Sequence, residues 1–147
     1  MCYDEAEEKI KKIISKSSNI LQNVVDFLYN FFHHYSWVGI YIIQGDDLLL
    51  GPWKGPHTTE HIRIPIGKGI CGSAAKTGKT EVVDDVNSDN RYIACFLSTK
   101  SEIVVPIKKD DIIVGEIDID SDKKDAFTLK DKIFLKKIAD MLSEHIL

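Results

Sequence analysis

The sequence predicts an α+β fold built on a mostly antiparallel sheet. Residues 5–32 carry apolar side chains at helical spacing, residues 37–121 change to short β-branched runs separated by turns, and residues 127–146 return to helical spacing. Two helices before the strands and one after them do not match the strand–helix alternation of parallel sheets. We therefore expect a central sheet of about six strands, with the N- and C-terminal helices on one face.

The predicted helices each have an apolar stripe. The first follows an acidic start and places Ile10, Ile13 and Ile14 on one side, and the second starts after Asn19, a suitable N-cap residue. The stripes of the second and last helices are Leu21, Val24, Val25, Leu28, Phe31 and Phe32, and Leu135, Ile138, Met141, Leu142 and Ile146. The broad stripe of the second helix also leaves room for a homodimer interface.

The predicted strands follow from β-branched runs and turn residues. Residues 37–43 and 48–50 form a hairpin, residues 51–56 a loop, and residues 62–66 a short strand near an edge. A glycine-rich turn leads into a short helix that begins after Cys71 and ends at Gly78, and residues 81–83 form a brief strand. Residues 101–108 and 112–119 complete the sheet.

Composition limits the classes of protein that fit. The chain has 147 residues, 44% hydrophobic and 29% charged, with a formal net charge of −4, which suits one domain over residues 1–147. This charge argues against nucleic-acid binding, and no apolar run is long enough to span a membrane. The acidic N-terminus does not resemble a signal peptide, and three cysteines are too few for a disulfide scaffold. We expect a cytoplasmic protein with free thiols.

Residues 67–72 match the GxGxxG pattern of dinucleotide sites. Such a site also needs a βαβ unit, which the strand order does not offer. The glycines more plausibly permit a tight loop and a close approach of two backbones. The cysteines and histidines lack the spacing of a metal site. The sequence therefore predicts neither a cofactor nor a metal.

Three acidic residues alternate along one predicted strand. Glu116, Asp118 and Asp120 face the same side, so they form either a solvated edge or a site. If residues 103–105 pair with this strand, Glu102 lies near Asp118 and Asp120. Clustered carboxyl groups raise one another's pKa, as a general acid at neutral pH requires.

Two cysteines have both a structural and a chemical interpretation. A lone cysteine is usually a small buried hydrophobic residue. Cys71 precedes a helix start, where the helix dipole favours the thiolate, and Cys95 lies in a loop. The pattern alone leaves both interpretations open.

Six stretches together resemble one family, the GAF-domain free methionine-(R)-sulfoxide reductases. They occur in the family's order at residues 37–41, 50–55, 62–72, 93–95, 101–106 and 117–121. The resemblance implies a GAF (PAS-like) fold over nearly the whole chain. It also implies an enzyme that reduces the R epimer of free methionine sulfoxide.

The resemblance carries roles to individual residues. Cys95 matches the nucleophile, Cys71 matches a resolving cysteine, and Glu102, Asp118 and Asp120 match the carboxylates of the pocket. Trp37 and Tyr41 match an aromatic wall, and both point to one face of their strand because they are four residues apart. Backbone N–H groups near Ile93 and Ala94 are expected to bind the substrate carboxylate.

One position departs from the family. A further family cysteine before residue 62 is replaced here by His61, so we expect a cycle that uses only Cys95 and Cys71. The expected partners are free methionine-(R)-sulfoxide, a thioredoxin-like thiol reductant and a second copy of the chain. The alternative is a GAF domain that senses a small ligand or oxidant without turnover.

Overall fold

The computed structural model describes residues 2–59, 61–92 and 98–146. The helices are α1 (Tyr3–Lys16), α2 (Ile20–Phe31), α3 (Gly69–Thr77) and α4 (Leu129–Leu142), with short 3-10 helices at η1 (Val86–Ser88) and η2 (Ser143–His145). The strands are β1 (Trp37–Gln44), β2 (Asp47–Lys54), β3 (Arg63–Pro65), β4 (Glu81–Val83), β5 (Ser101–Lys109) and β6 (Ile112–Ser121).

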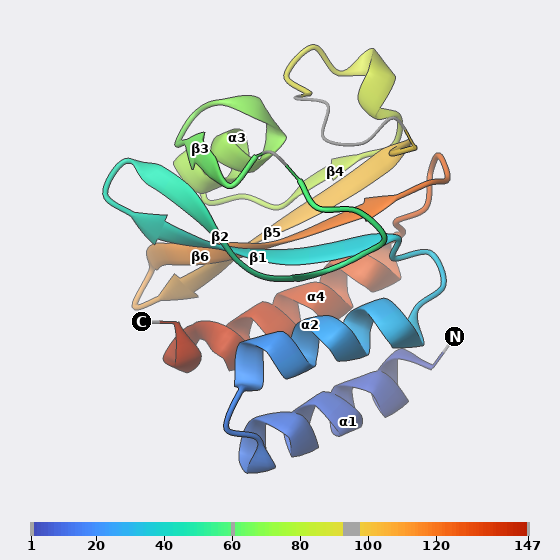
Figure 1. The fold of residues 1–147 in the computed structure, drawn as a ribbon, viewed down its shortest axis with the longest axis vertical. Coiled ribbons are helices and arrows are strands. Elements are labelled where there is room, and N and C mark those ends of the chain that lie inside the picture. The colour runs from blue at the N-terminus through green and yellow to red at the C-terminus, as the bar shows by residue number, and fades with distance from the viewer. Residues whose placement is uncertain (1, 60, 93–97, 147) are drawn as a thin grey trace.

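The strands form one antiparallel sheet in the order β3-β2-β1-β6-β5-β4. Figure 1 shows α2 and α4 against one face of this sheet, with α1 packed beneath them and α3 on the opposite face. The predicted fold class, with the terminal helices on one face, is therefore confirmed. Among the described residues, no helix has the length and apolar character needed to cross a membrane.

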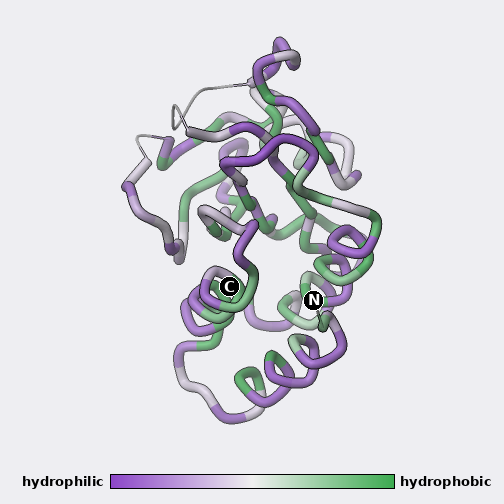
Figure 2. The backbone as a smooth tube through the Cα atoms, turned by 90° about the vertical axis from the view of Figure 1, so that its right-hand side faces the viewer, coloured by the Kyte–Doolittle hydropathy of each residue, from purple (hydrophilic) through white to green (hydrophobic). Residues whose placement is uncertain are grey.

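The helix-covered face holds the larger apolar core. Ile117 and Ile119 of β6 and Ile103 of β5 point into it and meet Leu28 of α2 and Leu135 of α4. Hydrophilic and hydrophobic segments alternate along the helices (Figure 2), which is the pattern expected of helices that bury one side. Because side chains alternate along a strand, the residues between these isoleucines face α3 instead.

Two local predictions were wrong. Residues 51–54 belong to β2 rather than to a loop, because Gly39 and Val38 of β1 pair with Trp53 and Lys54 across a shift in register. Helix α3 begins at Gly69, so Cys71 lies in its first turn rather than before it. Pro52 stands in β2 near its end, where pairing with β3 has already stopped.

The glycine-rich turn is a packing device, as predicted. Gly67 and Gly69 have positive φ angles of 95° and 70°. At Gly72 a Cβ would lie 2.7 Å from the carbonyl oxygen of Pro65, so only glycine allows α3 to approach the end of β3 this closely. The turn therefore fixes α3, and with it Cys71, over the sheet.

Candidate active site

Four carboxyl groups are buried together on the face of the sheet that carries α3. Glu116, Asp118 and Asp120 alternate along β6, a central strand, and Glu102 of β5 pairs directly with Asp120. None of the four residues is more than 6% exposed. The sequence left a solvated edge and a site as alternatives for this row, and its burial in the middle of the sheet excludes the solvated edge.

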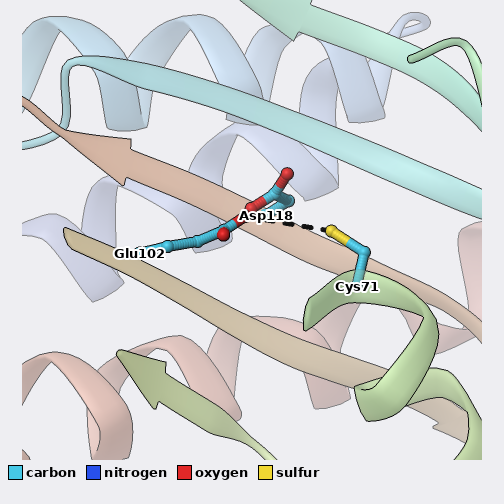
Figure 3. A group of neighbouring side chains, drawn as sticks. All are labelled: Cys71, Glu102 and Asp118. Carbon is cyan, nitrogen blue, oxygen red and sulfur yellow. Dashed lines mark hydrogen bonds between the residues drawn. The ribbon is translucent and has the colours of Figure 1, made fainter. Parts of the chain in front are cut away.

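Cys71 reaches the same cluster from α3. Its Sγ donates a hydrogen bond to Glu102 Oε2 at 3.9 Å, and one ligand atom from each of Cys71, Glu102 and Asp118 lies within 4.8 Å of the other two. Figure 3 shows the thiol pointing from α3 toward the two carboxyl groups on neighbouring strands. Helix α3 and the consecutive strands β5 and β6 therefore place a thiol on a carboxyl cluster.

The cluster is rich in oxygens without partners. Both carboxyl oxygens of Glu116 and one each of Asp118 and Asp120 are buried with no hydrogen-bond partner. Within the described parts of the chain, no lysine or arginine forms an ion pair with any of the four acids. A buried polar group without a partner costs about 1–3 kcal/mol, so this arrangement is unfavourable for folding alone and is typical of a functional site.

Burial raises the pKa of all four carboxyl groups. For Glu102 the charges of Asp118 and Asp120 and hydrogen bonding to both raise the pKa further. Burial and then the charge of Asp118 raise the pKa of Glu116 and of Asp120, against opposing effects of Cys71 on Glu116 and of Glu102 on Asp120. Burial also raises the pKa of Asp118 despite its interactions with Glu102 and Cys71. The raised pKa of Glu102 favours the protonated carboxyl expected there, beside two carboxyl groups of the neighbouring strand β6.

The surroundings of Cys71 oppose the effect of the helix dipole on its thiol. Burial raises the pKa of the Cys71 thiol well above its ordinary value, and the charges of Asp118, Glu116, Glu102 and Asp120 raise it further. The position in the first turn of α3 favours a thiolate through the helix dipole. Desolvation and four nearby acids outweigh that dipole, so Cys71 is a protonated thiol that needs a base before it reacts.

The two predicted aromatic wall residues lie on the carboxyl face of β1. Trp37 is opposite Asp120 and Tyr41 is opposite Glu116 in the register with β6. The Tyr41 hydroxyl donates to the carbonyl oxygen of His61 at 2.8 Å. The Trp37 ring packs near-parallel to Trp53, with ring centroids 6.3 Å apart, and lies so close to Gly39 that a Cβ there would meet it at 2.3 Å.

Asp120 separates two cavities. A cavity of about 20 Å³ is lined by Tyr41, Cys71, Glu102 and both aspartates, together with His61, Lys68 and Tyr92 among others. A second cavity, of about 70 Å³, is lined by Trp37, His57, Thr99 and Asp120 among others. The smaller cavity has room for one water-sized body. Binding an amino acid across both requires the lining side chains to move apart.

The structure brings together six of the nine predicted site residues, and the other three lie outside the described residues. Cys71, Glu102, Asp118, Asp120, Trp37 and Tyr41 converge on the two cavities. Cys95, Ile93 and Ala94 lie outside the described residues. Glu116 was noticed on the acidic face but was not among the predicted site residues, although its alternation with Asp118 was the signal that could have included it.

Comparisons with known proteins agree with this geometry. The GAF domain family model matches residues 18–146. The free methionine-R-sulfoxide reductase of Escherichia coli strain K12 is 34% identical over 124 residues, which cover 84% of this chain and 74% of that protein.

Solved structures agree as well. The type II free methionine-R-sulfoxide reductase of Thermoplasma acidophilum has 36% identity and a TM-score of 0.85, covering 91% of this chain and 94% of that one. The free methionine-R-sulfoxide reductase of Neisseria meningitidis, solved in complex with its substrate, has 34% identity and a TM-score of 0.91, covering 98% and 87%. The chain therefore belongs to the GAF-domain free methionine-R-sulfoxide reductase family.

Proposed function

We propose that this protein reduces free L-methionine-(R)-sulfoxide to L-methionine, using two of its own cysteines as the immediate reductant. Family membership supports an oxidoreductase that acts on this sulfoxide. The observation that carries the proposal is the buried carboxyl cluster beneath the Cys71 thiol, because sulfoxide reduction needs both a proton donor and thiols.

The first step needs an acid at the sulfoxide oxygen. Oxygen is a poor leaving group until it is protonated, and protonation also makes the sulfur electrophilic. We assign this proton transfer to Glu102 with Asp120, because burial and neighbouring carboxylates raise the pKa of both groups. The Cys95 thiolate then attacks the substrate sulfur. The hydroxyl passes from that sulfur to the Cys95 sulfur as the transient sulfur–sulfur bond breaks, so the products are methionine and the Cys95 sulfenic acid.

The second step forms a disulfide. The Cys71 sulfur attacks the Cys95 sulfur, a carboxylate of the cluster accepts the Cys71 proton and passes it to the leaving hydroxyl, and the hydroxyl departs as water. An external dithiol of the thioredoxin type then reopens the disulfide by thiol exchange, which returns both cysteines to thiols and oxidises the dithiol. The protein itself needs no cofactor in this scheme.

Substrate recognition follows from charge and shape. The ammonium group of the amino acid is a cation, and the cluster offers it Asp118 and unpartnered carboxyl oxygens. The S-methyl group and side chain lie between Trp37 and Tyr41, on one face of β1. We assign the substrate carboxylate to backbone N–H groups around Ile93 and Ala94. A homodimer remains part of the proposal, but the stripe of α2 predicted as its interface was wrong, because Val24, Val25 and Leu28 are buried in the core of the same chain.

The test is epimer-specific turnover. With dithiothreitol present, the purified protein consumes L-methionine-(R)-sulfoxide and leaves the S epimer unchanged. Cys95→Ser abolishes turnover, whereas Cys2→Ser, which removes an exposed thiol at the start of α1, does not change it. No turnover of the free R epimer would contradict the function. Full activity in Cys95→Ser with none in Cys71→Ser would reverse the two cysteine roles.

A second measurement separates the enzyme from a sensor. The fully reduced protein is mixed with the R epimer in the absence of any other oxidant. The enzyme forms methionine and loses two thiols for each sulfoxide reduced, whereas a sensor leaves the sulfoxide unreduced and keeps its thiols.

A further inference from the structure

One thiol and two carboxyl groups meet at a geometry that is close to that of a metal site. Ligand atoms of Cys71, Glu102 and Asp118 all lie within 4.8 Å of one another, and all three residues are buried (Figure 3). We propose that the reduced protein binds one zinc ion through these three side chains. The proposal goes beyond the reductase activity, because this reaction needs no metal.

The donor set suits zinc better than the other common divalent ions. Zinc accepts both sulfur and oxygen ligands, whereas magnesium and calcium prefer oxygen alone. With Zn–S near 2.3 Å and Zn–O near 2.1 Å, tetrahedral angles place the donors roughly 3.4–3.6 Å apart. The Cys71 Sγ to Glu102 Oε2 distance of 3.9 Å comes within a few tenths of an ångström of that arrangement.

The charge of the surrounding residues also favours a zinc ion. Glu116 lies next to the site, is 0% exposed, and has no partner for either carboxyl oxygen. Asp120 also presents an unpartnered oxygen, and none of the described lysines or arginines pairs with the cluster. A divalent cation offsets the repulsion between these acids, and the protonated Cys71 thiol releases its proton to solvent as the Zn–S bond forms.

The site also has room for a fourth ligand. The cavity of about 20 Å³ that these side chains line holds one water-sized body, and Asp120 lies at the same cavity. Three protein ligands and one water in this cavity would give zinc its usual four ligands. Sequence spacing did not indicate it because the ligands come from α3, β5 and β6, at residues 71, 102 and 118.

Zinc in this position inhibits sulfoxide reduction. This consequence rests on the proposed function, because Cys71 and Glu102 are the proposed resolving thiol and proton donor. The inhibition is reversible, since a chelator removes the ion without altering the thiol.

The experiment measures metal binding without substrate. The reduced protein is titrated with zinc in competition with a chromophoric chelator, and we expect one equivalent to bind. Cys71→Ser weakens this binding by roughly 100-fold or more, because losing even an outer-shell partner costs 10- to 100-fold. Cobalt replaces zinc in a parallel titration, and a thiolate-to-cobalt charge-transfer band appears in the wild type but not in Cys71→Ser.

The matched control is Cys2→Ser, which removes a thiol from the exposed start of α1 and keeps both the affinity and the band. Glu102→Gln keeps the shape of the side chain but removes its charge, so it tests the site if Cys71→Ser fails to fold. Absence of a one-equivalent site overturns the proposal, and so does unchanged affinity in both Cys71→Ser and Glu102→Gln.

The two proposals fail in different ways. If the protein binds zinc but does not reduce the R epimer, the reductase function is wrong and the metal site stands. If it reduces the R epimer and shows no zinc-dependent loss of activity, the metal site is wrong and the function stands.

Discussion

Two buried carboxyl sites on opposite faces of the sheet have opposite electrostatics. Asp131, at the start of α4, is 1% exposed and accepts hydrogen bonds from Tyr35 at 2.7 Å, His34 at 2.9 Å, the Thr128 backbone at 2.9 Å and Tyr3 at 3.1 Å. The cluster on β5 and β6 is equally buried, yet several of its oxygens have no partner. Donors surround the first site, and other acids surround the second.

The pKa values follow from that difference. Burial alone would raise the pKa of Asp131, but hydrogen bonds from His34, the Thr128 backbone and Tyr35 outweigh it and lower the pKa. Burial, together with the charge of the Asp131 carboxylate, raises the pKa of Tyr3 to about 12. Glu102 accepts a long hydrogen bond of 3.9 Å from the Cys71 thiol, and both burial and its acidic neighbours raise its pKa. Burial alone therefore does not decide the direction of the pKa shift, whereas the groups around the carboxyl do.

The largest expected effect is on catalysis at the cluster. Glu102→Gln keeps the side-chain shape but removes the transferable proton, so kcat/KM for the R epimer falls by about 10²–10⁴-fold, the usual contribution of a general acid. The free energy of unfolding, measured by urea denaturation, does not fall, because the change removes an acid from among like charges. Unchanged kcat/KM would show that Asp120 or Asp118 donates the proton instead.

The next effect is on stability at Asp131. Asp131→Ala leaves the hydroxyls of Tyr3 and Tyr35 and the ring of His34 without their common acceptor. The free energy of unfolding, measured by urea denaturation, is expected to be about 3–5 kcal/mol lower than in the wild type, because the variant leaves buried donors without an acceptor. The kcat of the remaining folded protein stays unchanged, because Asp131 is on the face opposite the cavities. A large drop in kcat with little loss of stability would contradict this division.

Removing the Glu116 carboxyl is expected to raise the free energy of unfolding, whereas removing the Asp131 carboxyl lowers it by a larger amount. Glu116→Leu replaces two unpartnered oxygens by an apolar group of similar volume, so the free energy of unfolding rises by about 1–3 kcal/mol. Asp140→Leu, a change at a solvent-exposed acid of α4, is the matched control and leaves stability within about 0.5 kcal/mol. Destabilisation by Glu116→Leu would mean that this carboxyl has a favourable partner.

Sequence patterns predicted most of the fold and part of the site. The alternation of Glu116, Asp118 and Asp120, with Glu102 on the neighbouring strand, was enough to place the acids together. Side chains alternate between the two faces of a strand, and this alternation sets how the strands pair when one face is buried. The raised pKa of Cys71 was not predictable, since it depends on how α3 docks on the sheet through Gly72. The local spacing of Thr128 and Asp131 is that of a capping box, but it gives no sign of the side-chain donors of Asp131, because His34 and Tyr35 are about a hundred residues away.

The smallest expected effect is a pair of opposite pH slopes in stability. The lowered pKa of Asp131 gives stability that is present above about pH 3.9, its unfolded value, and is lost as the pH falls through the folded pKa. The raised pKa of Glu116 acts in the other direction: the folded chain keeps a proton that the unfolded chain has lost, so stability falls as the pH rises from about 4.3 to the folded pKa.

Urea denaturation at a series of pH values separates the two slopes. Each group contributes at most about 1.4 kcal/mol per pH unit, the value for one proton. Asp131→Asn flattens the acid side of the wild-type curve and leaves the neutral side unchanged. Glu116→Leu reduces the slope on the neutral side only, where Glu102, Asp118 and Asp120 still contribute. If both variants changed the same side, the two sites would not differ in the sign of their pKa shifts, and the contrast between partnered and unpartnered acids would be wrong.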